Sequence, residues 1–259
     1  VLMITGSRGM AGAAYLSPKA AYTAGAGLVR IYTAEENRSI LQQLLPEAVI
    51  TCYGNYDEAE LTGLLNWADV VCIGCGLGTS DVSEQILETA LQQVRVPCII
   101  DADGLNLLSS HMDLLGKIQA PVILTPHMKE MSRLTGLTVS ELSERRVDII
   151  EEFAEKYPVV CVMKDSRTLV KKQGRHTFIN LAGNSAMAKA GAGDVLAGVI
   201  TGIVAQGMDV YEGAALGVFL HACGGDEARR LKGGYSVLAR DLIDGVGRCM
   251  DISRQQTAR

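Results

Sequence analysis

One stretch of the sequence combines small residues, an acid and an apolar run in an order that could perform chemistry. Gly191, Ala192 and Gly193 come directly before Asp194, and apolar residues dominate positions 195–203. Small residues let a ligand approach the backbone closely, and the free amides at the start of a helix attract anions. A carboxylate beside such a phosphate cradle could take a proton from a hydroxyl group. Alternatively, Asp194 is an ordinary first-turn acid that complements the helix dipole.

A second candidate segment follows a strand-like run and contains His127 and Glu130. His127 could hydrogen-bond a polar ligand, and Glu130 could hold a cation through water. The same residues also suit an ordinary helix start, with Glu130 as an acid in the first turn.

A third segment of cations and hydroxyls lies between a strand-like run and a hairpin, and it could grip the phosphates of a nucleotide. The alternative is a solvated polar turn, and the acid within the segment would repel a phosphate. Its residues are Lys164, Asp165, Ser166, Arg167 and Thr168.

Two acids, Asp101 and Asp103, follow another strand-like run in what we expect to be a loop. They could hold water around a metal, but we expect them to cap the turn at residues 104–108.

The elements that must position these side chains alternate along the chain between strand-like and helix-like patterns. Seven buried runs with intervening helices predict an α/β fold with a doubly wound, mostly parallel sheet. An antiparallel hairpin is expected at residues 168–180, around Gln173 and Gly174. We find no linker or repeat and expect one domain over residues 1–259, preceded by a missing segment because the chain opens directly in a strand. The expected strands are 1–5, 28–33, 47–51, 69–73, 97–101, 122–125 and 159–164, and the helices are 13–24, 35–45, 59–67, 82–94, 130–135, 139–156, 195–206, 211–229 and 237–250.

Charge and cysteine content narrow the class of partner. The formal net charge is −5 and no basic cluster is present, so nucleic acid and anionic membrane surfaces are not expected partners. No apolar run reaches the length of a membrane span. The seven cysteines lie largely in apolar surroundings, which indicates free thiols in a reducing compartment, the cytoplasm.

Taken together, the motifs resemble those of the ADP-dependent NAD(P)H-hydrate dehydratase family, a branch of the ribokinase-like superfamily. The resemblance covers nearly the whole chain. It is carried by Gly6-Ser7 with residues 12–14, residues 25–29, Pro46-Glu47, residues 73–78, residues 101–106, Thr125-Pro126-His127 with Glu130, and residues 184–198.

The resemblance implies a three-layer α/β/α fold and a repair reaction. The S form of hydrated NADH or NADPH (NADHX, NADPHX) would be phosphorylated on its ring hydroxyl by ADP, giving AMP, and loss of phosphate would restore NAD(P)H. ATP is the alternative nucleotide, and Mg²⁺ is expected. The family also implies a homotetramer and, in bacteria, a preceding NAD(P)H-hydrate epimerase domain.

The family pattern also assigns residues. Asp194 would be the catalytic base, and the amides of residues 191–193 would stabilise the transferring phosphoryl group. The hydrated coenzyme would lie near Ala13, Gly76, His127 and Asp194. The adenine nucleotide would contact residues 164–168 and Gly193, and Glu130 would help to hold magnesium.

Three positions depart from the family pattern. Asp165 stands where glycine is usual, Ala192 replaces a threonine, and Cys75 replaces a proline. Two rival hypotheses remain: a ribokinase-like small-molecule kinase of the hydroxymethylpyrimidine or hydroxyethylthiazole type, and a catalytically silent nucleotide-binding protein.

Overall fold

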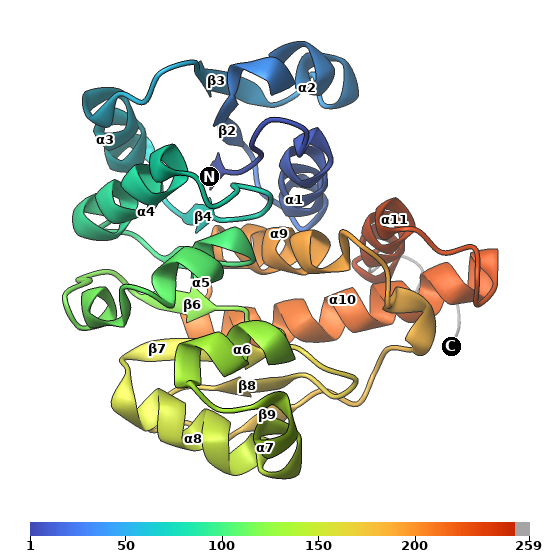
Figure 1. The fold of residues 1–259 in the computed structure, drawn as a ribbon. Helices are drawn as coiled ribbons and strands as arrows, with labels where there is room; N and C mark the ends of the chain where they lie inside the picture. Colours follow the sequence, from blue (N-terminus) through green and yellow to red (C-terminus); the bar gives the residue numbers. More distant parts are fainter. Residues whose placement is uncertain (252–259) are drawn as a thin grey trace.

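The computed structural model describes residues 1–251, in which a nine-stranded sheet carries helices on both faces (Figure 1). The strand order is β3-β2-β1-β4-β5-β6-β7-β8-β9; β1 to β7 are parallel, and β8 and β9 are antiparallel to their neighbours. The predicted doubly wound α/β sheet with a short hairpin is therefore confirmed. The strands are β1 (Leu2–Ile4), β2 (Arg30–Ala34), β3 (Val49–Tyr53), β4 (Val71–Ile73), β5 (Cys98–Ile100), β6 (Val122–Leu124), β7 (Val159–Met163), β8 (Leu169–Lys171) and β9 (Phe178–Ile179).

Strand residues alternate between the two faces of the sheet, as the period of two requires. In β1, Leu2 and Ile4 pack into the core on one face, and Met3 packs into the core on the other. The first face is covered by α3 (Glu58–Trp67), α4 (Asp81–Gln93), α5 (Asp103–Leu108), α6 (Met128–Thr135), α7 (Val139–Glu144) and α8 (Arg146–Lys156). The second is covered by α1 (Ala11–Thr23), α2 (Arg38–Leu44), α9 (Ala192–Val204) and α10 (Val210–Lys232), and α11 (Ala239–Cys249) packs against α1, α9 and α10.

The sheet reverses its winding direction between β1 and β4. From β1 the chain continues outward to β2 and β3, then returns to β4 on the other side of β1. The loops that follow β1 and β4 meet at this point, where the Gly6 amide donates to the Cys75 carbonyl at 2.9 Å and the Ser7 amide donates to the Gly76 carbonyl at 2.6 Å. Doubly wound sheets bind ligands at such a reversal, beyond the carboxyl ends of the strands.

Helices α1 and α9 are held unusually close by two glycines spaced four residues apart. A Cβ atom on Gly198 would lie 2.1 Å from the Ser17 carbonyl oxygen, and one on Gly202 would lie 2.5 Å from the Ala21 carbonyl oxygen. No side chain fits at either position. This contact fixes the start of α9, which carries Asp194, against the start of α1, which carries Ala13.

Two segments differ from the sequence-based expectation. Residues 103–108 form α5 and not a loop, and the expected helix at 139–156 is interrupted at Arg145, which has φ −130° and ψ 36°. Leu142 and Ile149 are seven residues apart, which is two helical turns, so a continuous helix could be inferred across Arg145. Within residues 1–251, no helix combines the length and apolar character needed to cross a membrane.

Candidate active site

A buried ion pair lies at the carboxyl edge of the sheet. Asp101 follows β5, Lys164 follows β7, and the Lys164 Nζ lies 2.6 Å from Asp101 Oδ1. Thr125, at the end of the intervening β6, donates its hydroxyl to the same Asp101 oxygen at 2.7 Å. Burial alone would raise the pKa of Asp101 and lower that of Lys164, but their mutual attraction and hydrogen bonds outweigh burial and stabilise both charges. The Lys164 ammonium therefore stays charged at the centre of the strand ends, with Asp101 as its counter-ion.

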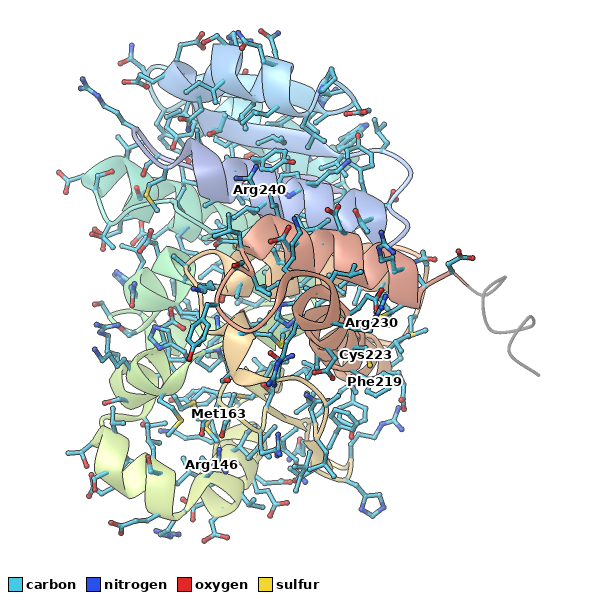
Figure 2. All side chains as sticks on the ribbon, turned by 90° about the vertical axis from the view of Figure 1, so that its right-hand side faces the viewer. Arg146, Met163, Phe219, Cys223, Arg230 and Arg240 are labelled. Carbon is cyan, nitrogen blue, oxygen red and sulfur yellow. The ribbon has the colours of Figure 1, made fainter. Side chains whose placement is uncertain are left out.

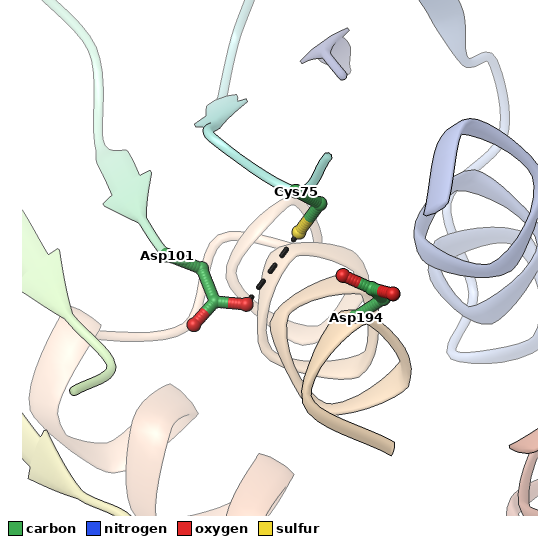
Figure 3. Close-up of side chains that lie close together, drawn as sticks. All are labelled: Cys75, Asp101 and Asp194. Carbon is green, nitrogen blue, oxygen red and sulfur yellow. Dashed lines mark hydrogen bonds between the residues drawn. The ribbon is translucent and has the colours of Figure 1, made fainter. Parts of the chain in front are cut away.

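Asp194 extends from the first turn of α9 towards this ion pair. One ligand atom each of Cys75, Asp101 and Asp194 lie within 4.8 Å of one another, and Figure 3 shows these three side chains converging. The Cys75 thiol donates to Asp101 Oδ2 at 3.6 Å. Burial raises the pKa of Asp194 to about 6, and the neighbouring Asp101 charge contributes, while Cys75 and Lys164 oppose the rise. Asp194 is therefore ionised at neutral pH with a pKa suited to a general base.

His127 and Glu130 form a reciprocal cap at the start of α6. His127 Nδ1 accepts from the amides of Lys129 and Glu130 at 3.1 and 3.0 Å, and Glu130 Oε2 accepts from the His127 amide at 2.7 Å. Burial raises the pKa of Glu130 to about 7, while Lys164, 3.8 Å away, opposes the rise. The helix start that the sequence analysis gave as an alternative for this segment is thus present. His127 Nε2 lies 3.5 Å from Glu130 Oε1, and about half of the His127 side chain is exposed, so a ligand can still approach the ring.

The Gly191–Gly193 loop has the close packing that its composition predicted. Gly191 has φ +88°, and a Cβ atom there would lie 2.6 Å from Leu16 Cδ1 and 3.0 Å from Ala239 Cβ. A Cβ atom on Gly193 would lie 3.4 Å from Lys164 Nζ. The start of α9 therefore brings its free amides next to the Lys164 ammonium, an arrangement that favours phosphate.

A cavity of about 980 Å³ opens beside this loop and is bounded by the segments after β7 and β9 and by α9 and α10. Its size suits a nucleotide-sized ligand. Its lining comprises His127, Lys164, Asp165, Ser166, Arg167, Thr168, Asn180, residues 182–185 and 187–189, Ala192, Gly193, Leu196, Val218, His221, Ala222 and Arg229.

Asp165 does not present an unpaired negative charge to this cavity. It forms an ion pair with Arg146 of α8, which is labelled in Figure 2. The repulsion of phosphate that the sequence suggested is therefore offset by a cation from a different helix.

The predicted site residues fall into two adjoining groups. The first is the proposed nucleotide set, residues 164–168 with Gly193, which lines the cavity together with His127. The second is formed by Ala13, Gly76 and Asp194, which are not among the described residues lining the cavity. A Cβ atom on Gly76 would lie 2.7 Å from Ala13 Cβ, so these two residues are in contact at the winding reversal. Asp101 links the groups, because it pairs with Lys164 of the first and lies close to Asp194 of the second.

The structure corrects one sequence-based expectation about the acids after β5. Asp101 does not cap the turn that follows; it pairs with Lys164 and Thr125. Asp103 accepts from the Gly78 amide at 2.8 Å and so ties α5 to the loop after β4.

Sequence reasoning missed Thr125, Arg146, Asn180 and His221. Thr125 could have been recognised, because it is the last residue of the predicted strand 122–125 and lies two residues before His127. The other three lie inside or after regular elements, where no local pattern distinguishes them.

The chain matches the family model described as NAD(P)H-hydrate dehydratase over residues 1–248. It is 36% identical over 252 residues to a bifunctional NAD(P)H-hydrate repair enzyme of Moorella thermoacetica, covering 94% of this chain and 48% of that relative. The chain thus spans about half the length of the bifunctional relatives that it matches. It is 33% identical to the ADP-dependent (S)-NAD(P)H-hydrate dehydratase of Neisseria meningitidis, covering 94% of this chain and 80% of the relative. Among solved structures, the ADP/ATP-dependent NAD(P)H-hydrate dehydratase of Bacillus subtilis, co-crystallised with ATP and Mg²⁺, superposes with a TM-score of 0.82 at 29% identity, covering 95% of this chain and 87% of the other.

Proposed function

Because the chain belongs to the NAD(P)H-hydrate dehydratase family, we propose that it converts the S form of hydrated NADH and NADPH back to NAD(P)H at the expense of a nucleotide. ADP is the proposed phosphoryl donor, as it is in the name of the Neisseria relative, and ATP is the alternative found in the name of the Bacillus structure. The observation that carries the proposal is the position of Asp194. It lies between the Ala13–Gly76 contact and the nucleotide-sized cavity, next to the phosphate-favouring start of α9.

The proposed chemistry proceeds in two steps. Asp194 takes the proton of the ring hydroxyl, whose oxygen attacks the terminal phosphoryl group of ADP and releases AMP. The carbon–oxygen bond then breaks as phosphate leaves, the adjacent ring carbon gives up a proton to water, and the ring double bond forms. Phosphorylation is needed because hydroxide is a poor leaving group at neutral pH and phosphate is a good one.

The other residues of the site would stabilise the negative charge of the phosphates and hold the two ligands. The Lys164 ammonium and the amides at residues 191–193 lie where they can stabilise negative charge on the transferring group. The Ala192 amide already donates to the Lys189 carbonyl at 3.2 Å, so the neighbouring amides would carry most of this role, without the hydroxyl that the family usually has. Cations and hydroxyls of residues 164–168 would hold the nucleotide phosphates, and the half-exposed His127 side chain would contact the coenzyme.

The surroundings of Glu130 fit magnesium held through water. One of its oxygens accepts the His127 amide, and the Lys164 ammonium lies 3.8 Å from that oxygen, which disfavours direct ligation of a second cation. Mg²⁺ commonly keeps several waters and binds substrate phosphates. When bound, it would neutralise phosphate charge.

The proposal also includes the cellular compartment and the oligomeric state. All seven cysteines are free, which supports a reducing compartment, and we place the protein in the cytoplasm. A homotetramer and a fused epimerase domain stay predictions from the family.

The test is recovery of reduced-nicotinamide absorbance from hydrated NADH in the presence of magnesium with ADP, ATP or no nucleotide. Recovery only with a nucleotide is expected, and the faster nucleotide identifies the donor. A stable phosphorylated product without recovery would indicate a kinase instead. Binding of ADP without any turnover would indicate a silent binder.

A further inference from the structure

Two buried polar atoms in the wall of the nucleotide-sized cavity have no hydrogen-bond partner. Asn180 and His221 are 5% and 8% exposed, and both line the cavity. Within the described chain, Asn180 Oδ1 and His221 Nε2 are without a partner. Buried polar atoms are almost always hydrogen-bonded, so two exceptions in one ligand cavity point to a ligand that satisfies them.

The orientation of the Asn180 amide is fixed by its neighbours. Its Nδ2 donates to the Ala182 carbonyl at 3.0 Å, and a carbonyl can only accept, so the two ends of the amide cannot be exchanged. The Asn180 backbone amide donates to the Thr168 carbonyl at 2.9 Å, which ties the residue to the proposed nucleotide segment. The unpaired Oδ1 is therefore an acceptor at a defined place.

The His221 ring also presents an acceptor. Burial lowers the pKa of His221 to about 4, so the ring is neutral at pH 7. A hydrogen bond with the Ala192 backbone favours the protonated ring, so in this bond the imidazole donates. Because Nε2 is the nitrogen without a partner, Nδ1 carries the proton and Nε2 carries the lone pair.

The two acceptors belong to neighbouring parts of the wall, and apolar side chains surround them. A Cβ atom on Gly183 would lie 3.3 Å from Ala222 Cβ, so the segment after Asn180 packs on the turn of α10 that carries His221. Leu196, Val218 and Ala222 line the same cavity. A flat, largely apolar ligand that presents N–H donors to the two acceptors fits these surroundings.

We propose that Asn180 and His221 select the base of the nucleotide by accepting hydrogen bonds from the 6-amino group of adenine, which a 6-oxopurine lacks. This inference rests on the proposed nucleotide-dependent function. A 6-oxo group would direct an acceptor at these two acceptors in place of the two N–H donors of the amino group. A site built to bond a polar group rejects analogues that lack it.

The first test is calorimetric binding to the full chain, with magnesium, of ADP, inosine diphosphate and purine riboside diphosphate. The last of these keeps the purine ring and the phosphates but has no amino group. ADP is expected to bind at least about tenfold more tightly than either analogue, since one or more hydrogen bonds are lost. Equal binding of ADP and purine riboside diphosphate would overturn the inference without any variant.

The second test uses His221→Phe and Asn180→Leu, which keep the size of the side chain and remove the acceptor. Each should weaken ADP binding about tenfold and leave purine riboside diphosphate within about twofold of the wild type. Ser166→Ala, elsewhere in the same cavity, is the matched control and should affect all three nucleotides alike.

His221→Phe and Asn180→Leu could instead weaken the binding of all three nucleotides by the same factor. That result would show that these residues only shape the cavity, and it would overturn the inference. Failure of the wild type to bind any of the three would contradict the proposed function itself. Retained ADP binding without base discrimination would contradict this inference alone.

Discussion

The Lys164 ammonium lies 2.6 Å from Asp101 Oδ1, although the two residues are 63 positions apart in the chain. They follow β7 and β5, and the parallel pairing of β5, β6 and β7 brings the ends of these strands to one edge. The pair supplies the positive charge beside the start of α9 and keeps two buried charges compensated. Its removal should therefore affect both stability and chemistry.

Lys164→Met tests this dual role. The substitution leaves Asp101 buried without its cation, and breaking a buried pair in this way costs about 3 kcal/mol or more. We expect a corresponding loss in the free energy of unfolding, measured with denaturant. The double variant Asp101→Asn with Lys164→Met should recover most of the stability and none of the turnover. Unchanged stability in the single variant would show that the pair is not structurally important.

The pH dependence of activity should report Asp194. Its pKa is about 6, raised by burial and by Asp101, while Cys75 and Lys164 oppose the rise. Above this pH the carboxylate can accept a proton, so kcat/KM should fall as the pH decreases through about 6. A rate that stays constant down to pH 5 would contradict the role of Asp194 as base.

The same shift predicts the sign of an effect on stability. The folded pKa of Asp194 lies above the ordinary value of 3.8, so the protonated carboxyl favours the folded state and this contribution is lost as the pH rises from about 4 to 6. Asp194→Asn should therefore be relatively more stable at pH 7 than at pH 4, when each is compared with the wild type in denaturant unfolding. The opposite ranking would mean that the Asp194 charge is stabilised in the fold.

Gly198→Ala tests the close contact of α1 and α9. The new methyl group would lie 2.1 Å from the Ser17 carbonyl oxygen, so the two helices must separate. We expect a loss of about 2–3 kcal/mol in the free energy of unfolding, as is typical of overpacking. Gly63→Ala in α3 is the matched control, because nothing lies within 4 Å of its Cβ position and alanine favours a helix. Similar stability of the two variants would contradict the close packing.

His127→Ala separates capping from ligand binding. It removes the acceptor of two amides at the start of α6, which should cost about 1 kcal/mol of stability. It should also weaken binding of the hydrated coenzyme more than binding of ADP in calorimetry. His127→Asn should restore the cap and not the coenzyme affinity. The reverse ranking of the two ligands would overturn the placement of the coenzyme.

The order and type of most elements could be predicted from the sequence because strands and helices here carry distinct apolar patterns. Helix α5 was missed because it begins just after Ala102, whose φ of +50° is unusual for a residue with a side chain. The break at Arg145 was missed because Leu142 and Ile149, on either side of it, are two helical turns apart and suggest one continuous helix.

The candidate site was predicted less completely, for a physical reason. Gly191, Gly193 and Asp194 are recognisable locally, since a loop, a helix start and an acid follow one another. The Asp101–Lys164 pair depends on the strand order. The lack of a hydrogen-bond partner for His221 Nε2 depends on the burial of this residue in the middle of α10. Neither property can be read from a local stretch of sequence.

The most direct test of the central claim compares turnover and ADP binding in one preparation of Asp194→Asn. The substitution removes the base and leaves the amides at residues 191–193, Lys164 and the cavity in place. Recovery of NADH from hydrated NADH should therefore fall by a factor of about 10² or more, as expected for loss of a general base. ADP binding measured by calorimetry should stay within a few-fold of the wild type. Turnover retained at the wild-type rate would contradict the assignment of Asp194 as the base, and parallel loss of ADP binding would mean that Asp194 serves to hold the loop.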